Sequence, residues 1–272
     1  MKRLLTIQDI SCVGQCSTTV ALPLISACGV ECAVLPPAML SNHTGGFRTW
    51  SFADLTPELP KVEAKWIEQG IRFDAFYTGY VCESHIDPIL SIMSSCANPG
   101  AVRIVDPAMA DNGRLYAGFA DDFPSRMARL VRGADYVLPN LTEAALLAGD
   151  EPRMTLDRAG VERLVAKLHA LGAKNVVLTG VSFGASELGS AVSDGSRIDY
   201  DFNPRLPRQC HGTGDVFASV FAGAILRGRT ALEAAALAAD IVCESLAATD
   251  DGHWYGVSFE RAIGSLVRAL PA

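Results

Sequence analysis

Residues 209–220 of this 272-residue chain read Gln-Cys-His-Gly-Thr-Gly-Asp-Val-Phe-Ala-Ser-Val. The Gly-Thr-Gly-Asp at their centre, which ends at Asp215, stands where an irregular stretch gives way to an apolar helical pattern over 216–227. Two glycines beside a threonine let backbone N–H groups turn outward at the start of a helix, where the helix dipole favours an anion. The stretch therefore predicts a cradle for a phosphate group, with Asp215 beside it as a carboxylate that can accept a proton from a substrate hydroxyl.

The same four residues also suit an ordinary helix cap, with Asp215 as a first-turn acid. Nothing within the motif separates the two explanations, and four-residue matches are frequent by chance. The decision between them therefore depends on the motifs elsewhere in the chain.

Short apolar runs alternate with helical patterns through the part of the chain that precedes this motif. Continuous apolar strands are typical of a parallel sheet that helices cover on both faces. We expect strands over 3–8, 31–35, 74–79, 102–105, 136–138 and 175–179, and helices over 17–28, 57–69, 86–97, 123–132 and 156–171. Two further runs, 187–193 and 197–202, flank Asp194-Gly195 and predict an antiparallel hairpin.

This order of elements predicts an α/β fold in three layers, with helices on both faces of a doubly wound, mostly parallel sheet and an antiparallel hairpin at its edge. We expect one domain over residues 1–272. In such sheets ligands bind beyond the carboxyl ends of the strands. The residues that follow each strand are therefore the candidates for a functional site.

Acidic and amide side chains follow two neighbouring strands of this order. Asp106 and Asp111 come after one expected strand, and Asn140 and Glu143 come after the next. Oxygen ligands of this kind suit a largely hydrated Mg²⁺ that bridges the phosphates of a nucleotide. Taken singly, each pair is also explained by a turn before Pro107 or by a helix cap.

Composition and missing motifs exclude several classes of function. The chain lacks G-x-x-x-x-G-K-[ST], which excludes a P-loop NTPase, and the absence of G-x-G-x-x-G after a strand disfavours a dinucleotide oxidoreductase. Lys and Arg number 23 against 30 Asp and Glu, a net charge of −7, so nucleic acid is not an expected partner. The longest uncharged stretch, 10–30, contains too many polar residues and a proline for a membrane span.

The cysteines and the N-terminus favour the cytoplasm. None of the eight cysteines forms C-x-x-C, and 49% apolar residues suffice for a large core without disulfides. Asp9 interrupts the apolar run that follows Lys2 and Arg3, so these residues do not begin a signal peptide. We expect a cytoplasmic protein with reduced thiols.

Taken together in chain order, the motifs resemble the ribokinase superfamily and, within it, the vitamin B6 kinases. Gly-x-Gly-Asp and Asn-x-x-Glu are typical of the superfamily, whereas Ser-Asn-His-Thr-Gly indicates the B6 branch. The resemblance covers nearly the whole chain and rests on Ile7-Gln8 with Gly14, Ser41-Asn42-His43-Thr44-Gly45, Gly79-Tyr80, Asp106-Pro107 with Asp111, Leu115-Tyr116, Asn140-x-x-Glu143, Thr179 and Gly212-Thr213-Gly214-Asp215.

The resemblance implies an ATP-dependent kinase that phosphorylates the 5′-hydroxymethyl group of pyridoxal, pyridoxine or pyridoxamine, the salvage of vitamin B6 to pyridoxal phosphate. In this reading Asp215 takes the proton of the hydroxyl, and the amides of Gly212, Thr213 and Gly214 hold the transferring charge. The implied substrate contacts are Asp9, Ser11, His43, Thr44 and Tyr80. The implied nucleotide contacts are Asp111, Tyr116, Thr179 and Thr213, and the residues that would arrange Mg²⁺, largely through water, are Asp106, Asn140 and Glu143.

The same resemblance implies a homodimer, and kinases of this family often use a monovalent cation such as K⁺. The partners are then ATP and a B6 vitamer, with neither nucleic acid nor membrane involved. Residues 36–49, rich in turn formers, are our candidate for a flap that covers the site.

Two departures from the family pattern leave alternatives open. Asp9 stands where B6 kinases usually have a Ser that contacts the pyridine, so the preferred vitamer is undecided. His211 before Gly-Thr-Gly resembles the hydroxymethylpyrimidine kinases of thiamin synthesis, although those often have Cys where this chain has Asp215. Cys210 is more readily explained as a packing residue than as a reactive thiol. A catalytically silent module that binds B6 or nucleotide is the third alternative.

Overall fold

The computed structural model describes residues 1–271, and the chain forms two compact units. Unit 1 comprises Met1–Val102 and the segment that begins at Leu206, and unit 2 comprises Arg103–Arg205. A single domain over 1–272 stays a prediction, and residue 272 lies outside the described part. Within that part no helix is both long enough and apolar enough to cross a bilayer.

Unit 1 contains both ends of the described chain. Its strands are β1 (Arg3–Ile7), β2 (Ile10–Ser11), β3 (Glu31–Leu35), β4 (Ala38–Leu40), β5 (Phe52–Asp54) and β6 (Phe73–Thr78). Its helices are α1 (Thr18–Ala27), α2 (Leu59–Glu68), α3 (Glu83–Ser95), α7 (Thr213–Leu226), α8 (Ala231–Ala248) and α9 (Ile263–Ala269), with 3₁₀ turns at Thr56–Glu58 and Phe259–Arg261.

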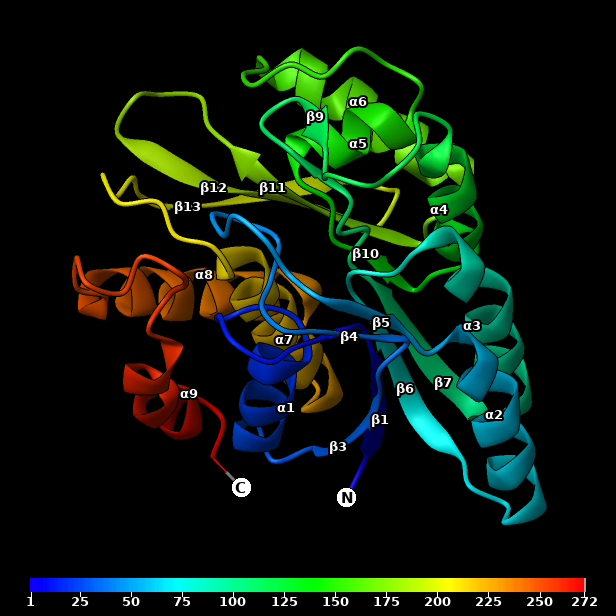
Figure 1. Ribbon diagram of the computed structural model, residues 1–272. Helices are drawn as coiled ribbons and strands as arrows, with labels where there is room; N and C mark the ends of the chain where they lie inside the picture. Colours follow the sequence, from blue (N-terminus) through cyan, green and yellow to red (C-terminus); the bar gives the residue numbers. More distant parts are fainter. Residues whose placement is uncertain (272) are drawn as a thin grey trace. The chain divides into compact units, whose positions relative to one another are not determined.

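A parallel sheet forms the middle layer of unit 1. Strand β1 pairs in parallel with β3 on one side and with β6 on the other. Leu4, Leu5 and Ile7 of β1 have no exposed surface, because consecutive side chains point to opposite faces and helices cover both. Figure 1 shows α1 and α7 on one side of these strands and α2 and α3 on the other.

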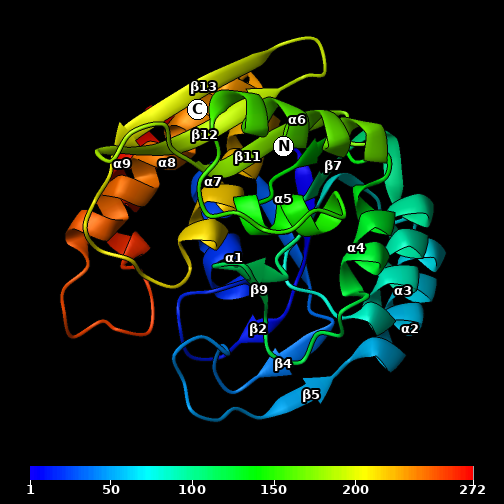
Figure 2. The ribbon, with the colours of Figure 1, turned by 90° about the horizontal axis from the view of Figure 1, so that it is seen from above.

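A second, smaller sheet of unit 1 lies outside the predicted elements. Strand β4 pairs in parallel with β2 and antiparallel with β5, and Figure 2 shows β4 and β5 side by side. These strands are only two or three residues long. Runs this short carry no period that the sequence could reveal.

Strand β7 (Ala97–Val105) passes from unit 1 into unit 2. The remaining strands of unit 2 are β8 (Ala110–Asp111), β9 (Arg114–Leu115), β10 (Tyr136–Val137), β11 (Asn175–Val181), β12 (Glu187–Ser193) and β13 (Ile198–Pro204). Its helices are α4 (Phe123–Val131), α5 (Leu141–Leu147) and α6 (Arg158–Leu171).

The sheet of unit 2 changes direction along its width. Strand β10 pairs in parallel with β7 and β11, and the hairpin β12–β13 continues the sheet antiparallel to β11. The mostly parallel sheet with an antiparallel edge hairpin is therefore confirmed. The ends of helix α6 have the capping residues that the sequence predicts. The Asp157 carboxylate accepts from the Gly160 N–H at 2.7 Å, and Gly172 ends the helix with φ of 112°.

The expected elements are found with shifted ends. Strand β7 begins five residues before the predicted 102–105, and α3 begins at Glu83 rather than at residue 86. The helix expected over 57–69 is a 3₁₀ turn followed by α2. Helix ends fray and depend on local capping contacts, which a hydrophobic pattern does not record.

Candidate active site

The start of α7 in unit 1 has the geometry that the Gly-Thr-Gly-Asp motif predicts. Gly212 precedes the helix with φ of 83°, a left-handed conformation that favours glycine. A Cβ added to Gly212 would lie 1.7 Å from the carbonyl oxygen of Gln15, so no side chain fits there. The hydroxyl of Thr213 donates to the carbonyl oxygen of Cys210 at 3.4 Å. The first amides of a 14-residue helix are thus presented by residues 212–214.

Asp215 lies in the first turn of α7, in surroundings that raise its affinity for a proton. Desolvation raises the pKa of Asp215 to about 7, although the residue keeps some exposed surface. The negative charge of Asp9 also raises this pKa, while hydrogen bonds from the Ser17 N–H and the Cys16 thiol lower it. A carboxylate with a pKa near neutrality is suited to general base catalysis.

Asp9, between β1 and β2, is buried, and its charge acts on Asp215. Burial raises the pKa of Asp9, and the hydroxyls of Ser17 and Ser11 donate hydrogen bonds that oppose this effect. The bond from Ser11 Oγ to Asp9 Oδ2 measures 2.8 Å. The structure thus brings three of the predicted residues, Asp9, Ser11 and Asp215, into one polar group.

Tyr80, after β6, belongs to the same neighbourhood. Burial raises its pKa above the ordinary range, and the charges of Cys82 and Asp9 add to this effect. The Tyr80 hydroxyl donates a hydrogen bond to the Cys82 sulfur. The phenol therefore stays neutral and presents a partly exposed ring, which suits contact with an aromatic substrate.

His43 is held by the protein through both of its ring nitrogens. Nδ1 accepts from the Gly45 N–H at 3.1 Å, so Nε2 carries the proton and donates to the Tyr255 carbonyl at 2.6 Å. Burial lowers the pKa of His43, which is 5% exposed. The ring also fills the space beside Gly14, where a Cβ would lie 2.0 Å from His43 Cδ2. These contacts leave neither ring nitrogen of His43 free for a substrate.

The predicted flap of residues 36–49 contains β4 and a loop that carries the remaining substrate candidate. Phe47 packs against Trp254 with ring centroids 4.8 Å apart, and the His43 and His211 rings lie 5.2 Å apart. Thr44 is half-buried in this loop. Its contact with a substrate and the covering role of the loop stay predictions.

The predicted metal residues lie in unit 2, where Glu143 is the centre of a hydrogen-bonded clamp. Its Oε2 accepts from the Asn140 N–H at 2.9 Å, and Oε1 accepts from the Met109 and Ala110 N–H groups at 3.1 and 3.4 Å. In return, Asn140 Oδ1 accepts from the Glu143 N–H at 2.9 Å. Burial raises the pKa of Glu143 to about 8, and the charge of Asp111 contributes in the same direction.

The clamp joins three segments at the carboxyl ends of β7, β10 and β11. Asn140 Nδ2 donates to the Ala110 carbonyl at 2.8 Å, and Asn140 forms a parallel bridge with Thr179. The Thr179 hydroxyl donates to the Pro139 carbonyl at 3.3 Å. The Tyr116 N–H donates to the Met109 carbonyl at 2.8 Å. The loop that begins at residue 106 is therefore fixed against the start of α5.

These residues fit a magnesium ion held through its water shell rather than by direct ligation. Within residues 1–271 no three His, Cys, Asp or Glu side chains cluster as metal ligands. Both oxygens of Glu143 already accept backbone N–H groups, and the exposed Asp111 accepts from the Asn112 N–H at 2.8 Å. Asp106 is 8% exposed. Carboxylates at the edge of such a clamp suit hydrated Mg²⁺, which gives up its waters reluctantly.

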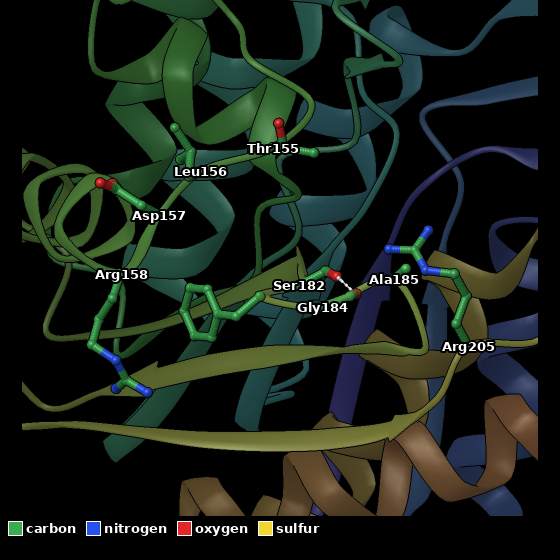
Figure 3. A pocket seen from close by; sticks show the side chains of 9 residues that line it. Thr155, Leu156, Asp157, Arg158, Ser182, Gly184, Ala185 and Arg205 are labelled. Atoms are coloured by element: carbon green, nitrogen blue, oxygen red, sulfur yellow. Dashed lines mark hydrogen bonds between the residues drawn. The ribbon is translucent and has the colours of Figure 1, made fainter.

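A cavity of about 730 Å³ lies in unit 2 beyond the end of β11 (Figure 3). The Arg158 guanidinium stands over the rings of Phe183 and Tyr200, 5.1 and 4.4 Å from their centroids. None of the predicted site residues lines this cavity, although Ser182 in its wall is three residues beyond Thr179. Its position alone does not connect it to the predicted chemistry.

Two residues that affect the pKa of Asp215 belong to no motif in the sequence. Cys16 and Ser17 reach Asp215 from the start of α1, through a thiol and a backbone amide. The only signal in the sequence was Gly14, which allows the turn before them with φ of 107°. Neither a cysteine nor a serine in an apolar stretch indicates by itself which carboxylate it will meet.

Comparison with known proteins gives similarity over nearly the whole chain. Residues 22–257 match a family model described as phosphomethylpyrimidine kinase. A pyridoxal kinase of Rubrobacter xylanophilus is 31% identical over 254 residues, which cover 88% of this chain and 84% of that protein.

Two crystal structures are also similar. The pyridoxal kinase of Lactobacillus plantarum is 33% identical, with a TM-score of 0.90 and coverage of 99% of this chain and 98% of that one. A Bacteroides thetaiotaomicron protein assigned as a phosphomethylpyrimidine kinase, in a crystal form with pyridoxal, is 29% identical, with a TM-score of 0.91 and coverage of 97% and 95%. These similarities extend over both units.

Proposed function

We propose, from the premise that the chain belongs to the phosphomethylpyrimidine kinase family, that it transfers the γ-phosphoryl group of ATP to the 5′-hydroxymethyl group of a vitamin B6 compound. The resemblance to the B6 kinases of the ribokinase superfamily is confirmed by the pyridoxal kinases that match it. The observation that carries the proposal is the partly exposed Asp215, with a pKa near 7, in the first turn of a helix that begins at a glycine cradle.

The proposed reaction needs one proton acceptor and one anion site. Asp215 accepts the hydroxyl proton as the substrate oxygen forms its bond to the γ-phosphorus. The bond from that phosphorus to the β,γ-bridging oxygen breaks, and ADP leaves with the electron pair. The amides at Gly212, Thr213 and Gly214 stabilise the charge on the three peripheral oxygens, because they point from the positive end of α7.

The substrate ring is assigned to the polar group of unit 1. Tyr80 offers a ring face, and Asp9, between β1 and β2, and Ser11, in β2, offer hydrogen-bonding groups. A carboxylate beside the ring nitrogen favours the protonated pyridine. His43 and Thr44 border the ring from the flap in this proposal.

Unit 2 is assigned to the nucleotide and its magnesium ion. Asp111, Tyr116, Thr179 and Thr213 are the nucleotide contacts that the resemblance implies, and we propose them as such. Asp106, Asn140 and Glu143 would hold Mg²⁺, largely through water, and Asn140 Oδ1 also accepts a hydrogen bond from the Glu143 N–H. When bound, Mg²⁺ neutralises charge on the phosphates.

Three further parts of the proposal rest on the resemblance: use of a monovalent cation such as K⁺, a homodimer, and a cytoplasmic location. Met39 and Phe52 of the small sheet are exposed large apolar residues, which is the surface character that a second copy would cover. Light scattering on purified protein tests the dimer, and the dependence of the rate on K⁺ tests the cation.

The test of the function is a direct assay. Purified protein with Mg·ATP is expected to convert pyridoxal, pyridoxine or pyridoxamine to its 5′-phosphate, with ADP formed in equal amount. The Asp215→Asn variant is expected to lose about 100- to 10,000-fold in kcat while it still binds ATP, because only the proton acceptor is removed. A wild-type protein that leaves all three vitamers unphosphorylated would overturn the proposal.

Phosphorylation of hydroxymethylpyrimidine is the second candidate function, favoured by the description of the matching family model. It uses the same chemistry on a smaller diazine. A comparison of kcat/KM for pyridoxal and hydroxymethylpyrimidine in one preparation decides between them. A module that only binds these compounds would show binding and no ADP formation in either assay.

A further inference from the structure

The turn of the flap at residues 43–47 lies against His211, the residue that precedes the glycine cradle. A Cβ added to Gly45 would lie 2.7 Å from both Cε1 and Nδ1 of the His211 ring. A Cβ added to Gly46 would lie 3.3 Å from Nε2 of the same ring. The shorter distance is well below an ordinary van der Waals contact. The His211 ring therefore fills the space that a side chain at Gly45 would need.

The two glycines of this turn exclude side chains for different reasons. Gly46 has φ of 79°, a left-handed conformation that by itself favours glycine. Gly45 has no positive φ, and the three atoms nearest to its added Cβ all belong to His211. Contact with the His211 ring is thus the identifiable reason why a side chain does not fit at Gly45.

The backbone of His211 is fixed to the cradle that follows it. His211 directly precedes Gly212, and its carbonyl oxygen accepts from the Val257 N–H at 3.1 Å. Val257 has no exposed surface, so this bond has a rigid donor. The bond involves only backbone atoms and is kept when the His211 side chain is replaced.

His43 fixes the other side of the same turn. Its Nε2 donates to the Tyr255 carbonyl at 2.6 Å, and its Nδ1 accepts from the Gly45 N–H at 3.1 Å. The rings of His43 and His211 lie 5.2 Å apart. Thr44 stands between His43 and Gly45 in the chain, so its position is set from one side by His43 and from the other by the His211 ring.

We propose that His211 is a positioning residue for the phosphorylation proposed above: its ring, packed against Gly45, sets the position of Thr44 relative to the glycine cradle. This inference rests on the proposed function, in which Thr44 borders the substrate ring. It assigns a role to the histidine that departs from the usual B6 kinase pattern. His211 acts through the flap and takes no part in proton transfer.

The consequence for the reaction is specific to one substrate. The 5′-hydroxyl must approach the γ-phosphorus in line, and a displacement of about 1 Å can cost up to about 100-fold in rate. A flap without the His211 ring behind it fixes Thr44 less well, so the vitamer binds more weakly. The cradle keeps its bond to Val257, so binding of ATP is expected to stay unchanged.

The experiment is a double-mutant cycle between His211 and Gly45 in the full chain. His211→Ala and Gly45→Ala are each expected to raise the KM for pyridoxal about tenfold while the KM for ATP stays unchanged. The first change removes the ring, and the second forces the ring and the flap apart. The double variant is expected to have a KM for pyridoxal no higher than His211→Ala alone, because the added methyl group enters the space that the ring has left.

Gly264→Ala is the matched control. Gly264 lies in α9, and its added Cβ would meet only the end of the Arg268 side chain, at 3.4 Å. This variant is expected to keep the wild-type KM for both substrates. Because His211 is exposed, its replacement is expected to leave the protein folded. A Gly45→Ala protein that folds only when His211 is also replaced would show the same contact, and the KM values of His211→Ala then decide its role.

A second readout does not depend on turnover. The dissociation constant of pyridoxal, measured by calorimetry without nucleotide, is expected to follow the same cycle as the KM. Unchanged binding of pyridoxal by His211→Ala overturns the proposal. Equal costs of Gly45→Ala with and without His211 also overturn it.

The outcomes separate this inference from the proposed function. An active wild type whose His211→Ala variant loses affinity for ATP as much as for pyridoxal overturns the positioning role alone, because the ring then supports the cradle rather than the flap. A wild type that phosphorylates none of the three vitamers overturns the proposed function and the role of His211 with it.

Discussion

The two units each contain a carboxylate with a raised pKa, but the two carboxylates have different partners. Both oxygens of Glu143 accept backbone N–H groups, and three such bonds hold it between 2.9 and 3.4 Å. Asp215 has one backbone donor from another residue, Ser17, and one weak thiol donor, Cys16, and it lies near a second carboxylate.

The comparison shows that a raised pKa does not by itself identify a catalytic acid or base. In both residues desolvation is the largest cause of the shift. What separates them is the capacity of the oxygens to accept a further proton or hydrogen bond. Glu143 uses that capacity to hold a loop, and Asp215 would keep part of it for a substrate in the proposed function.

The largest expected effect tests whether the geometry at the start of α7 is required. Gly212→Ala is expected to lower kcat by at least about 100-fold. Alanine disfavours the left-handed conformation, and its Cβ would collide with the Gln15 carbonyl oxygen, so the start of α7 and Asp215 would be displaced. Steady-state rates and the melting temperature measure it. Gly214→Ala is the control for stability: no atom lies within 4 Å of its added Cβ, so this variant is expected to keep the wild-type melting temperature or raise it.

The next prediction concerns Asp215 alone and the dependence of kcat/KM on pH. Because desolvation raises its pKa from 3.8 to about 7, the fraction of ionised base falls about tenfold per pH unit below 7, and kcat/KM is expected to fall with it. The free energy of unfolding is expected to change with pH in the opposite direction, falling where kcat/KM rises. The contribution of Asp215 is fully present below pH 3.8 and is lost as pH rises through about 7.

Urea unfolding at several pH values, wild type against Asp215→Asn, checks this sign. The neutral amide does not titrate, so the variant is expected to lack that loss of stability between pH 4 and pH 7. Equal pH dependence in the two proteins would contradict the assignment of a raised pKa to Asp215.

A third prediction compares the two carboxylates directly by stability. Glu143→Gln replaces one accepting oxygen with an NH₂ group that faces a backbone donor, and the free energy of unfolding is expected to fall by about 1–3 kcal/mol. Asp215→Asn is expected to keep or increase stability at pH 8, where the wild type buries a charge. Denaturant titration of both variants measures the difference, and the idea fails when Asp215→Asn proves the more damaging of the two.

The smallest expected effect compares two helix caps of the same kind, the half-buried one at Asn140 and an exposed one at Thr230. Thr230 caps α8 and accepts from the Glu233 N–H at 3.3 Å, as Asn140 accepts from Glu143 in α5. Thr230→Ala is expected to cost about 1 kcal/mol of stability and no activity. Asn140→Ala is expected to cost more, because its amide also holds the Ala110 carbonyl. Equal losses would mean that burial adds nothing to the motif.

Much of the fold was predictable because its signals are local. The buried runs of β1 and β11, the Asp194-Gly195 hairpin and the glycine that closes α6 each depend on a few consecutive residues. The small sheet β2–β4–β5 was not predictable for the converse reason. Its two- and three-residue strands exist through pairing between residues 29 positions apart in β2–β4 and 12 to 16 positions apart in β4–β5, and strands this short show no hydrophobic period in the sequence.

The candidate site divides in the same way. The sequence indicated Asp215 and the glycines before it, because a helix start with an acid in its first turn is a local pattern. It also placed His43 beside the site, but only the structure shows that both nitrogens of that ring are engaged by backbone groups. Hydrogen-bond partners far apart in the chain have no signature in a single sequence.

By itself, the sequence determined the order of strands and helices, the chemical type of each side chain at the strand ends, and the glycine-led helix start at residue 212. Only the tertiary structure decided that Cys16 and Ser17 act on the pKa of Asp215 and that both oxygens of Glu143 accept hydrogen bonds from backbone amides. The physical reason is that the proton affinity of a carboxylate depends on desolvation and on donors brought by distant segments. Those quantities do not exist until the chain has folded.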